Sequence, residues 1–313
     1  MRHVAAPTAA DLADTAAVVG ERLAPTPLIP APALGEDVHL KLETLQPTGS
    51  FKVRGGLAAL ARAEGPVITA SAGNAGLGVA WAAAALGVPA TIVVAENASP
   101  AKLAALQALP VTLVQHGMSY DAAEAHALAL AAEGAAYVSA YNDAGVIAGQ
   151  STVGRELEAQ LGAPLTVATP LGGGSLASGL GLWAAGRDAI RVVAIEAERS
   201  PAFTTALAAG RITPFEVGDT LADGLAGNLE PGSVTFELVR DHVAALAQVS
   251  EQEIAEAVRF LARAHGIVSE GAGAVAVAAV MTGRVPRGAG PLAVLVTGRN
   301  IALSRLAEVL GGG

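Results

Sequence analysis

The stretch LTVATPLGGGSLASGLGLWAAG, residues 165–186, joins a β-branched run, a glycine turn and a helix-forming run in immediate succession. Other short β-branched runs alternate with alanine-rich segments along the chain: PVITA, ATIVVA, VTLVQ, AYVSA, IRVVAIE and LAVLVT. Strands that are separated by helical crossovers form parallel sheets. The sequence therefore predicts an α/β fold with parallel or mostly parallel sheets flanked by helices.

The overall composition excludes several classes of protein. The chain has 313 residues, is 52% hydrophobic and carries a net charge of −9. This length favours two domains or lobes. Nucleic acid is not an expected partner, because the chain is acidic and has no basic run. The absence of cysteine excludes disulfides and thiolate metal sites, and it favours a cytoplasmic protein.

One apolar stretch, GLGVAWAAAALGVPATIVVA at residues 76–95, could be mistaken for a membrane span. A spanning helix needs about 20 consecutive apolar residues. Gly87 and Pro89 instead divide this stretch into an alanine-rich helix and a β-branched strand. We expect a buried helix followed by a buried strand, and no membrane interaction.

Lys52 is the first candidate for catalysis. The chain has only three lysines, Lys41, Lys52 and Lys102, whereas arginine carries most of the positive charge. Lys52 lies in QPTGSFKVRGGLAAL, residues 46–60, at a predicted loop-to-helix junction. A desolvated lysine amine can lose its proton and attack a carbonyl, which a guanidinium cannot do. Lys52 is therefore either a surface cation or a Schiff-base nucleophile.

The glycine run at residues 172–174 is a candidate phosphate site. Successive glycines before a helix aim several backbone N–H groups at an anion. The same segment also fits a dinucleotide fingerprint, Gly172-x-Gly174-x-x-Ala177, with Glu196 about 20 residues further on. The segment is therefore a candidate site either for NAD(P) or for a simpler phosphate-bearing ligand.

Two further polar turns follow predicted strands. In TASAGNAGLGVA, the Ser71–Asn74 turn could bind an anion at a helix start, or Ser71 or Asn74 could simply cap that helix. Thr297 ends the strand in PLAVLVTGRN, where it could face a ligand or cap the helix in IALSRLAEVL. A lysine nucleophile, a phosphate cradle, an anion-binding turn and a strand-end hydroxyl together are what a pyridoxal-phosphate site needs.

These segments resemble fold-type-II pyridoxal-phosphate enzymes, and in particular the threonine/serine dehydratase and serine racemase group. The resemblance spans residues 23–310 and rests on seven ordered motifs: KLETLQPTGSFKVRGG, SAGNAGLGVA, VIAGQSTVGRELE, PLGGGSLASG, TLADGLA, SEGAGAVAVAA and VTGRN. It implies a two-lobed homodimer that acts on a small amino acid. Residues 1–57 and 144–313 would form the large cofactor-binding domain, and residues 58–143 a small inserted domain.

The resemblance also implies roles around the cofactor ring. Lys52 would be the catalytic residue, which forms the Schiff base and then moves the Cα proton. Phe51 would lie beside the ring, and Asn74 would hydrogen-bond its phenolic oxygen. Thr297 would face the pyridine nitrogen. Glu270, in SEGAGA, matches an acid near the cofactor.

Two anionic groups would be held by backbone donors. The donors implied for the cofactor phosphate are Gly172, Gly173, Gly174, Ser175 and Leu176. The residues implied for the substrate carboxylate are Ser71, Ala72, Gly73, Asn74 and Ala75.

Departures from the family pattern refine the expected activity. Serine racemases carry a second serine where this chain has Ala72, as dehydratases do. We therefore expect a dehydratase (ammonia-lyase) that converts L-threonine, L-serine or a related 3-hydroxy amino acid to a 2-oxo acid and ammonia by β-elimination. A serine-type racemase or another pyridoxal-phosphate β-elimination or replacement enzyme is the alternative, and an NAD(P)-dependent oxidoreductase is a distant one. Ala75 replaces a frequent histidine, which would alter the substrate pocket.

Glu196 and Ser200 are weak candidates for a metal site. Some relatives bind a divalent cation near the position of Glu196, but a further acidic ligand of theirs is replaced by Ala202. Calcium and magnesium need several oxygen ligands. We therefore expect weak metal binding or none.

Overall fold

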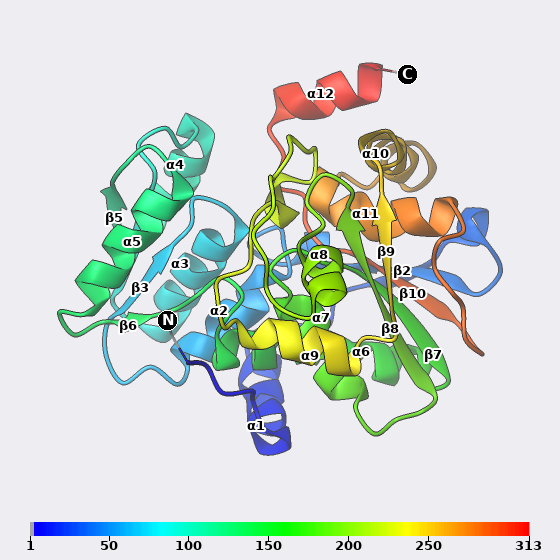
Figure 1. Cartoon of the computed structure of the whole chain (residues 1–313), viewed down its shortest axis with the longest axis horizontal. Coiled ribbons are helices and arrows are strands. Elements are labelled where there is room, and N and C mark those ends of the chain that lie inside the picture. The colour runs from blue at the N-terminus through cyan, green and yellow to red at the C-terminus, as the bar shows by residue number, and fades with distance from the viewer. Residues whose placement is uncertain (1–2, 313) are drawn as a thin grey trace.

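The computed structural model describes residues 3–312, which contain two β-sheets (Figure 1). The larger sheet has the order β1-β2-β10-β7-β8-β9, from strands β1 (Leu28–Pro30), β2 (Val38–Leu42), β7 (Leu165–Pro170), β8 (Ile190–Ala197), β9 (Ala245–Val249) and β10 (Leu292–Val296). The smaller has the order β5-β4-β3-β6, from β3 (Val67–Ala70), β4 (Ala90–Val94), β5 (Thr112–Gln115) and β6 (Ala136–Tyr137). Apart from the antiparallel β1–β2 pair, neighbouring strands run parallel, which confirms the predicted α/β class.

Helices cover both sheets (Figure 1). Those near the smaller sheet are α3 (Asn74–Leu86), α4 (Pro100–Gln107) and α5 (Tyr120–Ala131). The others are α1 (Ala9–Gly20), α2 (Lys52–Leu60), α6 (Ala144–Leu161), α7 (Ser175–Ala184), α8 (Ala202–Ala209), α9 (Val234–His242), α10 (Glu251–His265), α11 (Gly271–Met281) and α12 (Leu303–Gly311). Short 3₁₀ turns occur at η1 (Pro32–Leu34), η2 (Glu43–Leu45) and η3 (Asp223–Leu225).

The seven predicted strands are all present, although AYVSA contributes only the two residues of β6. The sequence analysis missed β1, β2 and β9. β1 is only three residues long and ends in proline, and β9 (ALAQV) contains a single β-branched residue, so neither stands out as a β-branched run. Residues 76–95 divide into α3 and β4 as expected. Within the described chain, no helix combines the length and the apolar character that a membrane crossing requires.

The core of the larger sheet forms around α11, whose residues 271–279 are buried on every side. This helix contacts β7, β8, β9 and β10. The neighbouring α10 is amphipathic and begins with the expected capping box, in which the Ser250 hydroxyl accepts from the Glu253 N–H and the Glu253 carboxylate accepts from the Ser250 N–H. The two helices thus close one face of the sheet.

Helix α2 lies between α3 and α6 at unusually short range, because glycines line the contacts. A β-carbon added to Gly56 would lie 2.5 Å from the carbonyl oxygen of Gly78, and one added to Gly149 would lie 2.5 Å from that of Arg54. No side chain fits at these distances. The glycines therefore fix α2, and with it Lys52 at its first position, against two neighbouring helices.

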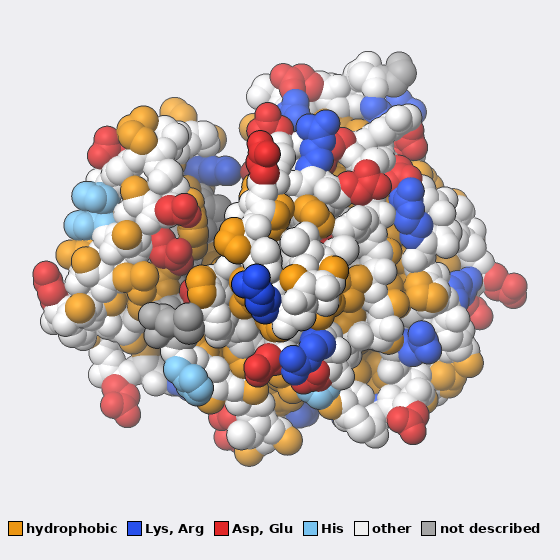
Figure 2. Space-filling view, in the orientation of Figure 1, with side chains coloured by type: hydrophobic (Ala, Val, Ile, Leu, Met, Phe, Trp, Pro, Cys, Tyr) orange, Lys and Arg blue, Asp and Glu red, His pale blue; other side chains and the backbone are white. Residues whose placement is uncertain are grey.

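The strand ends gather the predicted site segments. β3 ends just before Ser71, β7 just before Leu171 and the glycine run, and β10 just before Thr297. In parallel α/β sheets the crevice outside the carboxyl ends of the strands is where ligands bind. The face in Figure 2 mixes acidic and basic side chains, and its described residues form no extended basic patch there. This face therefore lacks the electrostatic footprint of nucleic-acid binding.

Candidate active site

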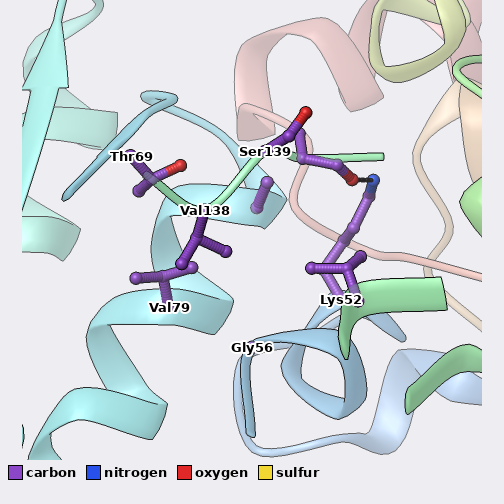
Figure 3. A pocket seen from close by; sticks show the side chains of 9 residues that line it. Lys52, Gly56, Thr69, Val79, Val138 and Ser139 are labelled. Carbon is purple, nitrogen blue, oxygen red and sulfur yellow. Dashed lines mark hydrogen bonds between the residues drawn. The ribbon is translucent and has the colours of Figure 1, made fainter. Parts of the chain in front are cut away.

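Lys52 is the first residue of α2, at the loop-to-helix junction that the sequence predicted. Its side chain is partly buried, and Nζ donates a hydrogen bond of 2.7 Å to the carbonyl oxygen of Ala140 (Figure 3). No acidic side chain pairs with this amine among the described residues. Burial lowers the pKa of Lys52 from 10.5 to about 8. Lys52 is therefore a desolvated amine and not a surface cation.

Phe51 and Thr297 meet beside this lysine. The Phe51 N–H donates to the carbonyl oxygen of Thr297 at 3.1 Å, and Ser50 forms a β-bridge with Gly298. Thr297 is only 3% exposed. The alternative role of Thr297 as a helix cap is wrong, because α12 begins at Leu303 and its N-cap is Ala302. The carboxyl end of β10 is thus joined directly to the lysine loop.

A small cavity lies beside Lys52 (Figure 3). Its wall includes Ala75 at the start of α3, Thr69 on β3 and the segment Val138–Ala140. The Thr69 hydroxyl is buried without a hydrogen-bond partner among the residues described. Sequence analysis missed residues 138–140. Their position at the carboxyl end of β6, next to β3, is the signal that could have found them.

The glycine run forms an N–H-lined turn at the start of α7. Gly174 is its N-cap, at a φ of +92° that side chains disfavour. Close neighbours also require glycine here, because a β-carbon on Gly172 would lie 2.8 Å from Leu225 Cα. Gly173 lies against the Tyr141 ring, next to the Ala140 that binds Lys52. The glycine run contacts Tyr141 and Lys52 binds Ala140, so two consecutive residues connect the glycine run with the lysine.

The backbone donors of this turn remain available. Within the described part of the chain, the N–H groups of residues 172–175 donate no hydrogen bond to a backbone carbonyl. Ser175 and Leu176 occupy the first turn of α7 and are buried. The Thr235 hydroxyl, which sequence analysis missed, donates to the Gly173 carbonyl at 2.9 Å. Because this bond pairs the carbonyl and leaves the N–H groups unused, the turn suits an anion.

The Ser71–Ala75 turn enters α3 without the side-chain cap that was the alternative interpretation. Gly73 is the N-cap, and no side chain caps the helix. The Ser71 hydroxyl instead accepts from the Gly73 N–H at 3.2 Å. Ala72 packs against the core of the smaller sheet. The turn therefore presents the unsatisfied N–H groups of a helix start, a suitable place for a carboxylate.

Asn74 joins this turn to the larger sheet. Its Nδ2 donates to Glu270 Oε1 at 2.7 Å. Glu270 precedes α11 and is 6% exposed. Burial raises the pKa of Glu270 to about 7, although the hydrogen bond from Asn74 opposes that shift. The acid that the resemblance placed near the cofactor therefore binds Asn74 directly.

The residues present fit pyridoxal phosphate. Lys52 offers a desolvated amine, residues 172–175 offer N–H donors to a phosphate, and Thr297 offers a buried hydroxyl. In addition, the Ser50 hydroxyl is fully buried and lacks a hydrogen-bond partner among the described residues, like that of Thr69. Buried polar groups are nearly always paired. The Thr69 hydroxyl also lines the cavity beside Lys52 and is therefore suited to a bound polar molecule.

The carboxylate of Glu196 is hydrogen-bonded to the start of a neighbouring helix. It accepts from the N–H groups of Phe203 and Thr204 and from the Thr204 hydroxyl, at 2.6–2.9 Å, and so caps the first turn of α8. Burial raises the pKa of Glu196, while these hydrogen bonds oppose the shift. Ser200 accepts from Gly227 N–H and makes no hydrogen bond to Glu196. Glu196 is thus poorly placed for a ribose or a metal, and no described group of three acidic, histidine or cysteine side chains could hold a metal ion.

Comparison with known proteins agrees with this geometry. The family model described as pyridoxal-phosphate dependent enzyme matches residues 19–298. The L-threonine ammonia-lyase of Thermotoga maritima is 38% identical over 287 residues, which cover 89% of this chain and 71% of that protein. The crystal structure of a T.th. threonine deaminase is 35% identical at a TM-score of 0.86 and covers 95% of this chain and 99% of that one.

A maize serine racemase structure is also similar, with 27% identity, a TM-score of 0.90 and coverage of 98% of each chain. The family match extends over both sheets and includes the lysine loop, the α3 turn and the glycine run. It accounts for the desolvated Lys52 and for the Ser71–Asn74 turn, which an NAD(P)-binding site would leave without a role. The chain therefore belongs to the family of pyridoxal-phosphate dependent enzymes.

Proposed function

We propose that the enzyme is a dehydratase (ammonia-lyase) that converts L-threonine, L-serine or a related 3-hydroxy amino acid to a 2-oxo acid and ammonia. The observation that carries this proposal is Lys52, a desolvated amine with a pKa of about 8 beside the cavity that Ala75 lines. The names of the Thermotoga ammonia-lyase and the T.th. deaminase support the substrate class.

The chain offers one group of residues for each part of the cofactor. Lys52 would hold it as the Schiff-base lysine, and Phe51 would lie beside the ring. The N–H groups of Gly172, Gly173, Gly174, Ser175 and Leu176 would bind its phosphate, and Asn74 would donate to its phenolic oxygen. Thr297 would offer a neutral hydroxyl to the pyridine nitrogen, which, unlike a carboxylate, would not hold that nitrogen protonated.

The substrate carboxylate binds at the α3 turn, residues 71–75, where the helix N-terminus stabilises negative charge. Bound pyridoxal phosphate supplies the electron sink for this chemistry. The free amine of Lys52 would take the Cα proton. The Cβ–O bond would then break, and the hydroxyl would leave as water with the proton that Lys52 took from Cα. The released enamine takes up water and yields the 2-oxo acid and ammonia, so atoms and charge balance.

The visible absorption spectrum of the protein mixed with pyridoxal phosphate, before and after L-threonine, tests this function. We expect a band near the blue edge of the visible range that Lys52→Ala removes, and formation of 2-oxobutanoate with threonine. Lys102→Ala is the matched control, because the Lys102 side chain is 46% exposed and does not line the cavity. If the unmodified protein forms no band, the proposal is wrong.

Racemisation is a second candidate, which the likeness to maize serine racemase favours. A racemase needs an acid or base on the face opposite Lys52. Ala72 provides none, and the Ser71 hydroxyl already accepts from Gly73. Chiral chromatography of serine after incubation decides between the two activities. We expect ammonia and pyruvate with little D-serine, and more D-serine from Ala72→Ser.

We also propose the lobes and the assembly that the resemblance implies. Residues 58–143 hold the whole smaller sheet, and residues 1–57 and 144–313 hold the larger one, with α2 crossing the boundary. A cytoplasmic homodimer is the expected form, in keeping with a cysteine-free chain. Light scattering of the protein eluted from a size-exclusion column measures its molecular mass. The mass of a monomer would contradict the proposed homodimer.

A further inference from the structure

The amide of Asn74 lies between two residues that flank elements of the larger-sheet core, a helix packed on that sheet and one of its strands. Asn74 Nδ2 donates to Glu270 Oε1 at 2.7 Å, and Asn74 Oδ1 accepts from Asn300 Nδ2 at 2.6 Å. Glu270 precedes α11, and Asn300 follows β10. Hydrogen bonds to residues across the site therefore hold both the NH₂ group and the oxygen of the Asn74 amide.

These two contacts allow only one orientation of the amide. The Nδ2 of Asn300 can only donate a hydrogen bond, and its other partner, the Thr48 carbonyl, can only accept one, so the atom of Asn74 that faces Asn300 must be the amide oxygen. If the Asn74 amide turned over, its oxygen would face Glu270 and its NH₂ would face the Asn300 NH₂. The hydrogen bond to Asn300 would then be lost and replaced by repulsion between two NH₂ groups, and an ionised Glu270 would also repel the turned oxygen. With the observed orientation, Asn74 Nδ2 uses one hydrogen on Glu270 and keeps its second hydrogen for a ligand.

The two partners are themselves held in place. Asn300 Nδ2 also donates to the Thr48 carbonyl at 2.8 Å, and the Arg299 N–H donates to the Gly49 carbonyl at 2.9 Å. These contacts attach Asn300 to the loop that leads into Lys52. On the other side, the Glu270 N–H donates to the Gly298 carbonyl at 3.1 Å.

The glycines of these two loops make the approach possible. A β-carbon on Gly298 would lie 2.9 Å from Glu270 Cδ, and one on Gly49 would lie 3.2 Å from Asn300 Cγ. Either substitution would therefore push one partner away from Asn74. The lysine loop, the end of β10 and the start of α3 thus form one connected arrangement around this amide.

We propose that Asn300 is a positioning residue, which together with Glu270 fixes the Asn74 amide so that Nδ2 donates to the phenolic oxygen of the cofactor. This inference rests on the role of Asn74 in the proposed function. Asn300 does not touch the reacting atoms and acts through Asn74. It lies at the exposed rim, so its replacement leaves the core intact.

Asn300→Asp is the decisive variant. An aspartate at this position accepts where asparagine donates, which favours the turned amide, with its NH₂ toward the aspartate and its oxygen toward Glu270. The cofactor then loses a donor. We expect the dissociation constant for pyridoxal phosphate, from titration of the visible band, to rise about tenfold, as for one hydrogen bond to a charged acceptor. Asn300→Ala, which removes the donor without reversing it, should weaken binding less.

A double-mutant cycle separates positioning from general damage. In an Asn74→Ala background, Asn300→Asp has no amide left to turn and should change the dissociation constant by less than about twofold. The wavelength and pH dependence of the visible band should shift in Asn300→Asp, because the phenolic oxygen loses a hydrogen bond. Asn97→Ala is the matched control. That asparagine makes one exposed hydrogen bond, to the Met118 carbonyl.

Two outcomes would overturn the inference. One is an Asn300→Asp protein that binds the cofactor as wild type does with an unchanged band. The other is an equal loss from Asn300→Asp with or without Asn74. Either result leaves the proposed function standing if the wild-type protein still forms its band and turns over threonine. Should Asn300→Asp fail to fold, as judged by its thermal unfolding, Asn300→Ala and the same cycle give the answer.

Discussion

A β-carbon added to Gly78 would lie 2.8 Å from the carbonyl oxygen of Lys52. The backbone of Lys52 and helix α3 are therefore in direct contact, and Gly78→Ala forces them apart. We expect a loss of about 1–3 kcal/mol in the free energy of unfolding, as for overpacked cores. Pyridoxal phosphate should also bind more weakly, because Lys52 moves relative to the α3 turn. Urea unfolding and a titration of the visible band measure the two effects.

Gly65→Ala is the matched control for Gly78→Ala. A β-carbon on Gly65 meets no atom within 4 Å, and this glycine does not have a positive φ. Its replacement should change stability by less than about 1 kcal/mol, and in the favourable direction if the unfolded chain loses freedom. Equal stability of the two variants would contradict the close contact between α2 and α3.

The lowered pKa of Lys52 predicts how the cofactor attaches at different pH values. Only the unprotonated amine attacks an aldehyde. Because the pKa of Lys52 is about 8 and not 10.5, the rate of attachment to cofactor-free protein should rise with pH and level off above about pH 9. Stopped-flow absorbance measures that rate. A profile still rising steeply at about pH 10 would mean that the amine is not desolvated.

The hydrogen bonds to Glu196 predict that divalent cations leave this enzyme unchanged. Both carboxylate oxygens already accept from α8, at Phe203 and Thr204. Magnesium, calcium or EDTA should therefore shift neither turnover nor the thermal midpoint. Glu196→Ala should instead lower stability by about 1–3 kcal/mol, because buried N–H groups lose their acceptor. A magnesium-dependent rise in the thermal midpoint that Glu196→Gln abolishes would show a cation site after all.

Sequence alone predicted the residues whose role depends on local pattern. The glycine run was found because a strand, a turn and a helix are contiguous there, and Lys52 because lysine is rare in this chain and lies at a loop-to-helix junction. The family motifs include both. The helix-cap alternatives for Ser71, Asn74 and Thr297 were wrong for two reasons. The extended backbone of Gly73 already begins α3, and residues 298–301 form a loop that delays α12 until Leu303.

The contacts across the site could not be predicted in this way. Ala140 lies 88 residues from Lys52, and Asn300 lies 226 residues from Asn74. No local periodicity links such residues, and only the arrangement of the two sheets brings them together. The partners of the Glu196 side chain could not be predicted from the sequence either. Its position at the end of β8 fits a ribose contact, but the following helix takes up both oxygens.

Arg54, two residues after Lys52, has a structural role. It is fully buried and pairs with Glu43 at 2.8 Å and with Glu156 at 2.6 Å, while Lys41 also pairs with Glu156. Burial disfavours the charge of Glu43, but Arg54 holds the pKa of that carboxyl below its usual value. The group therefore contains two cations and two anions that compensate one another.

Arg54→Met should therefore destabilise the fold strongly, by about 3–5 kcal/mol, because it leaves the buried Glu43 carboxylate without its partner. Adding Glu43→Gln removes that charge and should restore part of the loss. Urea unfolding at neutral pH compares the wild type, the two single variants and the pair. If the losses of the single variants simply add, then Arg54 and Glu43 do not stabilise each other, and the lysine-bearing end of α2 must be held mainly by its glycine contacts.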